Sequence, residues 1–182
     1  MRQRIAFVLA VGATTAVSVA TALAATHTSS TGNLGRTIPD GGVLVQKLKV
    51  EQEGKVKDVN ALVRLDHSYD GDLVIWLQGP GGVATTLMSQ DGGDGEDLGT
   101  GPNNCSGNPT KFDDEAAEGI GSGSAPFDGS FQPNDFNTDP PPERGLVEFD
   151  GHPATGTWKL FVGDSEYEDK GKLGCFKLQI KT

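Results

Sequence analysis

Hydrophobic and polar residues alternate along several short stretches of the chain, and turn residues separate these stretches. Residues 43–50 and 56–66 place apolar side chains at every second position over part of their length. This period of two predicts β-strands with one buried face. Residues 73–77 form a continuous apolar run that ends at the Gly/Pro-rich residues 79–82, which predicts a strand buried on both faces or nearly so. Residues 83–88 follow as the second arm of a predicted hairpin.

Three further strands are predicted at residues 146–149, 157–162 and 173–180. Between them and the hairpin, residues 89–144 are dominated by Gly, Asp, Asn, Pro and Ser, with isolated apolar residues such as Phe136. Because no later segment shows a long 3.6-residue period, the pattern predicts an all-β fold, a jelly-roll-like β-sandwich with a long Gly/Asp-rich insert. Inserts of this length without structure are unusual in compact domains, so we expect a disulfide or metal ions to hold it.

The first residues follow another pattern. Met1-Arg-Gln-Arg4 precedes an Ala/Val-rich apolar run that ends at Ala22-Leu-Ala24, which is the order of a secretory signal peptide. The run is long enough for a membrane anchor, but Thr and Ser residues dilute it and no positive cluster follows. We therefore predict a signal peptide at residues 1–24, a flexible Ser/Thr/Gly-rich lead-in at residues 25–37 and one domain at residues 38–182. The protein is then secreted without a stable membrane span, and the Ala-rich style favours bacterial export.

Charge and cysteine content narrow the function further. The chain has a formal net charge of −10, which repels nucleic acid and anionic membranes and favours cations. Nucleic-acid binding is therefore excluded. Cys105 and Cys175 are the two cysteines, and in an exported protein the simplest interpretation is one disulfide. Two free thiols or a redox pair are the alternatives.

A series of short motifs runs through residues 38–182. In order they are His67-Ser-Tyr-Asp-Gly-Asp-Leu73, Leu77-Gln-Gly-Pro-Gly-Gly-Val83, Phe112-Asp-Asp-Glu-Ala116, Pro126-Phe-Asp-Gly-Ser-Phe-Gln-Pro133, Phe149-Asp-Gly151, Gly156-Thr-Trp158 and Asp169-Lys-Gly-Lys-Leu173. The series resembles the P domain (P/Homo B domain) of bacterial-type proprotein convertases, although Phe176 stands where that family usually has tryptophan. The resemblance implies a galactose-binding-like sandwich that serves a subtilisin-like protease domain. Since no such protease domain is present in this sequence, it implies a partner in trans.

Candidate catalytic residues are few. The predicted domain contains two histidines, His67 and His152, and His67 is best interpreted as a turn residue at the entry to a strand. The Gly-Asp-Ser sequence that ends at Ser165 follows a predicted strand and precedes no helix, which favours a β-turn over a nucleophile motif. Trp76 and Trp158 lie within apolar strands, which favours the core over a sugar-binding platform. We predict a non-catalytic module; the alternatives are a serine-type endopeptidase component or other hydrolase, and a carbohydrate-binding or adhesive sandwich.

Carboxylates gather within and beside the Gly-rich insert. Calcium takes six to eight oxygen ligands, and glycine lets backbone carbonyls turn toward an ion. Lys111 and its neighbours offer little counter-charge. We therefore predict a first calcium site, to which the P-domain resemblance adds support, and a possible second site across a turn, where side-chain caps are the alternative. The ligands of the first site are Asp91, Asp97, Asp113 and Asp114, and those of the second are Asp164 and Asp169. A solvated acidic loop is the alternative for the first set.

Overall fold

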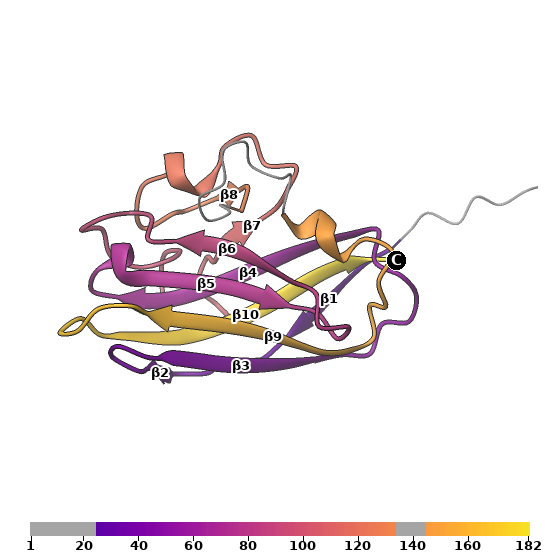
Figure 1. Ribbon diagram of the computed structural model, residues 1–182, viewed down its shortest axis with the longest axis horizontal. Coiled ribbons are helices and arrows are strands. Elements are labelled where there is room, and N and C mark those ends of the chain that lie inside the picture. The colour runs from indigo at the N-terminus through magenta and orange to yellow at the C-terminus, as the bar shows by residue number, and fades with distance from the viewer. Residues whose placement is uncertain (1–24, 134–144) are drawn as a thin grey trace, which may run out of the picture.

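Two β-sheets pack face to face in a computed structural model that describes residues 25–133 and 145–182 (Figure 1). The larger sheet has the order β1-β10-β4-β7-β8, with β2 also paired to β10, and the smaller has the order β3-β9-β5-β6. The strands are β1 (Thr26–Ser30), β2 (Arg36–Ile38), β3 (Val43–Val50), β4 (Asp58–His67), β5 (Leu73–Gln78), β6 (Ala84–Ser89), β7 (Thr110–Phe112), β8 (Ser130–Phe131), β9 (Gly156–Asp164) and β10 (Gly171–Lys181). The 3-10 helices are η1 (Asp70–Asp72), η2 (Ile120–Ser122) and η3 (Leu146–Phe149). The predicted all-β sandwich is confirmed.

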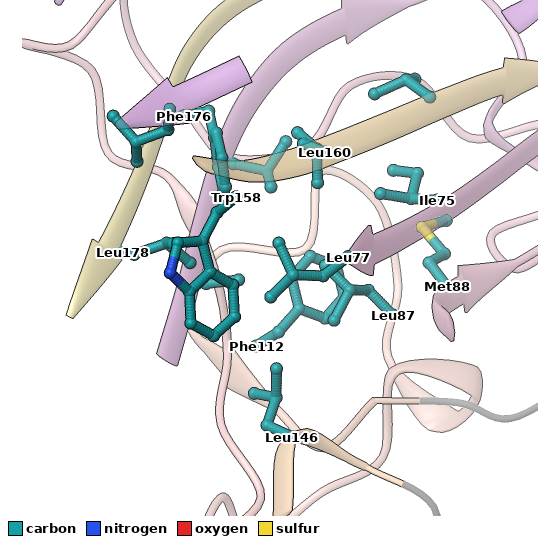
Figure 2. Close-up of a cluster of buried hydrophobic side chains, with 14 of the residues drawn as sticks. Ile75, Leu77, Leu87, Met88, Phe112, Leu146, Trp158, Leu160, Phe176 and Leu178 are labelled. Carbon is teal, nitrogen blue, oxygen red and sulfur yellow. The ribbon is translucent and has the colours of Figure 1, made fainter. Parts of the chain in front are cut away.

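The core lies between the two sheets and is formed by alternate side chains of the strands. The side chains that point inward are buried in both central strands. They are Val59, Ala61, Val63 and Leu65 of β4 and Leu73, Ile75 and Leu77 of β5. Trp158 is 1% exposed and lies within this cluster (Figure 2). It packs edge-on against Phe149 at a centroid distance of 4.9 Å and donates its indole N–H to the backbone carbonyl of Ala154. Burial of this apolar surface is the main stabilising contribution to the fold.

The predicted hairpin forms, but one of its strands was assigned the wrong environment. β5 and β6 pair antiparallel, and β5 also pairs with β9. Its residues alternate between buried and half-buried, so Val74 and Trp76 point to the outer face of the smaller sheet. The prediction of a strand buried on both faces or nearly so is therefore right for the inner face and wrong for the outer face, which is half-buried, and the assignment of Trp76 to the core is wrong. The core assignment of Trp158 is confirmed.

The prediction of a flexible lead-in at residues 25–37 is wrong. β1 pairs with β10 over five residues, and β2 pairs with a different part of β10. The side chains of β1 are mostly exposed, so its sequence shows no hydrophobic alternation. Backbone hydrogen bonds to an existing sheet edge hold the segment instead.

The Gly/Asp-rich insert contains β7, β8 and η2, and a disulfide joins Cys105 to Cys175, so the predicted bridge forms. Residues 146–149 form η3 and no strand, because backbone N–H groups of Leu146 and Val147 bond to the carboxylate of Asp114. The predicted signal peptide and Phe136 lie outside the described residues. Within the described ranges, no helix has the length and hydrophobicity needed to cross a membrane.

Candidate functional site

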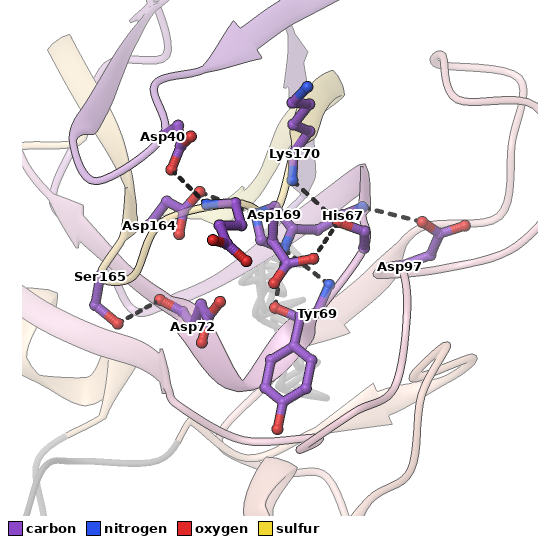
Figure 3. A network of polar contacts seen from close by, with 11 residues as sticks. Asp40, His67, Tyr69, Asp72, Asp97, Asp164, Ser165, Asp169 and Lys170 are labelled. Atoms are coloured by element: carbon purple, nitrogen blue, oxygen red, sulfur yellow. Dashed lines mark hydrogen bonds and ion pairs between the residues drawn. The ribbon is translucent and has the colours of Figure 1, made fainter.

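A cluster of polar side chains occupies one end of the sandwich, where β4 ends and η1 leads into β5 (Figure 3). The loop of residues 91–97 is bound to this corner by its backbone. The N–H of Asp70 donates to the Gly95 carbonyl at 2.8 Å, and the N–H of Gly71 donates to the Gly93 carbonyl at 2.9 Å. A Cβ on Gly71 would lie 3.0 Å from that same carbonyl oxygen, so the close approach requires glycine.

His67 lies at the centre of this corner and is buried. Its Nδ1 lies 2.9 Å from the carbonyl oxygen of Tyr69, and its Nε2 lies 3.3 Å from Oδ2 of Asp164, at the end of β9. The backbone N–H of His67 donates to Oδ1 of Asp97 at 3.0 Å. A Cβ on Gly171 would lie 2.3 Å from His67 Cδ2, which explains the glycine in the last motif of the series. Both ring nitrogens of His67 therefore have protein partners.

Ser165, the serine of the Gly-Asp-Ser motif, has a structural role in this corner. Its hydroxyl and its backbone N–H both bond to the carbonyl oxygen of Asp72 at 2.9 Å. Burial raises the pKa of the Asp72 carboxyl, and the charges of Asp164 and Asp169 raise it further. These contacts join the start of β5 to the chain that follows β9.

Asp70 is the most unusual group in the corner. It is 0% exposed, and within the described chain neither of its carboxylate oxygens has a hydrogen-bond partner. Burial, and then the charge of Asp97, raise the pKa of Asp70 from 3.8 to about 7, and the nearby backbone N–H of Asp97 only partly opposes this rise. A carboxylate in this position takes up a proton or binds a cation, since leaving it charged and unpaired is costly. Asp70 was not among the predicted ligands, because an Asp-Gly-Asp sequence between two strands looks like an ordinary exposed turn.

The structure separates the four residues of the first predicted calcium site into two pairs. Asp91 and Asp97 lie in the loop beside Asp70, and Oδ2 of Asp91 accepts the Ser89 N–H at 3.1 Å. Asp113 and Asp114 follow β7, whose Phe112 pairs with Ala61, six positions before His67 on β4. At about 3.3 Å per residue, the two pairs are roughly 20 Å apart and do not share an ion.

Asp113 and Asp114 also have protein partners of their own. Lys111 forms an ion pair with Asp113, and although burial opposes ionisation, hydrogen bonds from Lys111 and Glu115 lower the pKa of Asp113. This corrects the expectation that Lys111 supplies little counter-charge. Asp114 accepts the N–H groups at the start of η3, at 2.9 and 2.6 Å.

Both residues of the second predicted site lie at the corner. Asp164 contacts His67, and Oδ1 of Asp169 accepts the hydroxyl of Ser68 at 2.7 Å. Across the described residues, no group of three or more His, Cys, Asp or Glu side chains is arranged to hold a metal ion. The carboxylates of this corner that could hold a cation are those of Asp70 and Asp97, because calcium binds carboxylate oxygens and Asp70 lacks a hydrogen-bond partner. Arg64 lies 4.0 Å from Oδ2 of Asp97 and supplies part of the counter-charge there.

No family model and no curated protein matches the sequence. The fold is similar to part of a chain in the crystal structure of the serine protease of Aeromonas sobria in complex with a chaperone, with 19% identity, a TM-score of 0.52 and 87% of this chain covered. It is also similar to the structure of the Aeromonas sobria serine protease without the chaperone, with 18% identity, a TM-score of 0.50 and the same coverage. The chain spans 27% of the length of each chain it matches. At these identities the similarity establishes a shared fold.

Proposed function

We propose that this protein is a non-catalytic module that binds a serine protease of the subtilisin-like class and is stabilised by calcium. The observation that carries the proposal is the similarity of the fold, which spans 87% of this chain and 27% of the Aeromonas sobria serine protease chain. A module of this fold is thus part of one serine protease chain. The motif series that resembles P domains supports the subtilisin-like class of the partner.

The candidate catalytic groups already have hydrogen-bond partners within the protein, and this supports a non-catalytic role. A general base needs a free nitrogen within hydrogen-bond distance of its nucleophile. Both nitrogens of His67 already contact Tyr69 and Asp164. The hydroxyl of Ser165 donates to a backbone carbonyl.

Calcium enters the proposal through Asp70. The ion would be held by the carboxylates of Asp70 and Asp97 and by backbone carbonyls of residues 91–97, and it would supply positive charge to a carboxylate that has no donor. Such an ion would fix the Gly-rich loop against η1. Asp113 and Asp114 are not part of this site because they lie at the other end of β4.

The disulfide supports secretion. Disulfides form and persist in oxidising compartments such as the periplasm and the extracellular space. The bond between Cys105 and Cys175 fits such a location. The apolar N-terminal run is the segment that would direct export.

The proposal is tested with residues 25–182, prepared with the disulfide formed. Biolayer interferometry measures binding to the subtilisin-like protease exported by the same organism, blocked at its active site with phenylmethylsulfonyl fluoride. We expect saturable binding in calcium that weakens in EDTA. Absence of binding to the blocked protease contradicts the proposal.

Casein hydrolysis and labelling by a fluorophosphonate probe test the catalytic alternative on the same preparation. We expect neither. Hydrolysis that disappears in His67→Ala or Ser165→Ala and persists in His152→Ala, at equal protein stability, would establish an enzyme instead.

A further inference from the structure

The outer face of the smaller sheet carries an apolar patch. The alternation of β3, β5 and β9 that buries one set of side chains leaves another set pointing away from the core. Val43 is 49% exposed, and the others are half-buried. The strand register places them in two neighbouring rows across the sheet. We call this set the outer patch; it consists of Val43, Val45, Val74, Trp76 and Phe161.

A depression of about 250 Å³ lies within the outer patch. In the register, Gly163 pairs with Val43 on one side and with Val74 on the other, so the row lacks a side chain at its centre. Trp76 and Ser165 also line the depression. Tyr167, which is 75% exposed, lies against Gly41 at its edge. A pocket with aromatic side chains at its border is the usual site of a binding hot spot between proteins.

The geometry of the aromatic pair disfavours a sugar ligand. Trp76 and Phe161 stack with centroids 4.8 Å apart and an interplanar angle of 6°. Each ring covers one face of the other, and Thr86 is the cross-strand neighbour on the far side of Trp76. The pair therefore presents ring edges to the solvent, whereas a sugar stacks on an open ring face. Edges and aliphatic groups suit contact with an apolar side chain.

Two lysines stand beside the outer patch on the same face. Lys47 and Lys159 are directly paired in the register, two positions along their strands from Val45 and Phe161. Within the described chain, neither lysine forms an ion pair. The lysine row lies four residues from the row of Gly163, which corresponds to roughly 13 Å. An acidic group of a partner at that distance from its apolar anchor would meet both lysines.

We propose that the outer patch docks a folded protein that inserts an aliphatic side chain into the depression and presents carboxylates to Lys47 and Lys159. The inference rests on the proposed function, because it names the surface through which the protease partner is bound. A second copy of this chain fits less well. A net charge of −10 makes two copies repel each other.

Gly163→Ala tests the depression without disturbing the fold. An added Cβ would lie 3.4 Å from the Val74 carbonyl oxygen, 3.6 Å from Trp76 and 3.7 Å from Val43, which are ordinary contacts. The methyl group fills the floor where the partner side chain would sit. Gly119→Ala is the matched control, because its Cβ would meet nothing within 4 Å and the residue lies in another part of the fold.

Binding to the blocked protease is measured for the wild type and the variants by biolayer interferometry, and thermal midpoints check the fold. We expect Gly163→Ala to weaken binding at least tenfold with an unchanged or higher midpoint, and Gly119→Ala to bind like the wild type. We expect Lys47→Glu/Lys159→Glu to slow association several-fold and to reduce its dependence on salt.

The outcomes separate the two proposals. If the wild type binds and both Gly163→Ala and the charge-reversal variant bind equally well, the docking surface is wrong and the proposed function stands. If the wild type does not bind the protease, the proposed function fails and this inference fails with it. Sedimentation that shows a wild-type dimer dissociated by Gly163→Ala would make a second copy the occupant and overturn the proposal.

Discussion

The Nε2 atom of His67 lies 3.3 Å from Oδ2 of Asp164, and both side chains are fully buried at one end of the sandwich. His67 belongs to the larger sheet and Asp164 to the smaller, so this polar contact joins the two sheets. The second carboxylate oxygen of Asp164 has no partner within the described chain. The contact therefore has a large effect when one side is removed.

Asp164→Ala is expected to lower the free energy of unfolding by about 2 kcal/mol, because it leaves a buried ring nitrogen of His67 without its side-chain partner. Urea unfolding measures the change. Asp40→Ala is the control, since exposed Asp40 accepts one backbone N–H and its loss should cost less than about 1 kcal/mol. The double variant His67→Gln/Asp164→Ala should cost less than the sum of the single variants His67→Gln and Asp164→Ala. Additive losses would contradict a coupled pair.

Asp70 makes the stability of the calcium-free protein depend on pH. Its pKa is about 7 in the folded protein and 3.8 as its ordinary value, so the folded state binds the proton more tightly than the unfolded state. The stabilisation is therefore fully present below about pH 4 and is lost as the pH rises through 7. At 1.36 kcal/mol per unit, the shift corresponds to roughly 4 kcal/mol.

Asp70→Asn removes this dependence. In EDTA, we expect thermal midpoints of the wild type to fall between pH 5 and pH 8 and those of the variant to change much less. Above pH 7, calcium should raise the wild-type midpoint by several degrees, magnesium should not, and Asp70→Asn should not respond. Asp94→Asn, in the exposed part of the same loop, should behave like the wild type. A full calcium response in Asp70→Asn would remove Asp70 from the site.

A variant of Asp114 tests whether this residue has a structural role or binds calcium. Its carboxylate accepts the N–H groups of Leu146 and Val147, so Asp114→Ala should lower the free energy of unfolding by about 1 to 2 kcal/mol. The midpoint shift caused by calcium should stay at its wild-type size. In contrast, Asp97→Asn should reduce that shift. A calcium response lost in Asp114→Ala and retained in Asp97→Asn would restore the ligands predicted from the sequence at that end of β4.

The central strands could be predicted because their signal is local. β3, β4, β9 and β10 each carry apolar residues at alternate positions over part of their length, and this alternation predicts a strand from the chain itself. The burial of Asn60 and Arg64 on the other face of β4 left no such pattern. β1 and β2 escaped prediction because a non-local edge of β10 holds them through backbone bonds, which leave no pattern in side chains. Residues 146–149 resembled a strand because three of the four are apolar. The structure buries Leu146 and Phe149, which are three positions apart, the spacing of a single 3-10 turn.

The candidate site could be predicted only in part. The acidic, Gly-rich composition of residues 91–97 indicated an ion site, and Asp97 does lie beside the unpartnered carboxylate. Sequence spacing could not show that Asp113 lies at the opposite end of β4, because that distance depends on the register of β7. It also could not show that Asp70 is buried, since Asp-Gly-Asp is a common exposed turn.

The disulfide closes a span of 70 residues between Cys105 and Cys175, and most of its effect should come from the unfolded state. Other contacts hold the Cys105 loop on β10: Asn103 donates to the Lys172 carbonyl at 2.9 Å, and Lys177 donates to the Cys105 carbonyl at 3.0 Å. The double variant Cys105→Ser/Cys175→Ser should therefore keep the wild-type circular dichroism spectrum.

Its thermal midpoint should nevertheless fall by about 10 °C, because the chain-entropy model gives a loss of roughly 4 kcal/mol for a loop of this size. A reducing agent should lower the wild-type midpoint to the value of the double variant and leave the variant unchanged. If the folded spectrum changed as well, the bond would be needed to position the loop. An unchanged midpoint would contradict the expected contribution of the disulfide to stability.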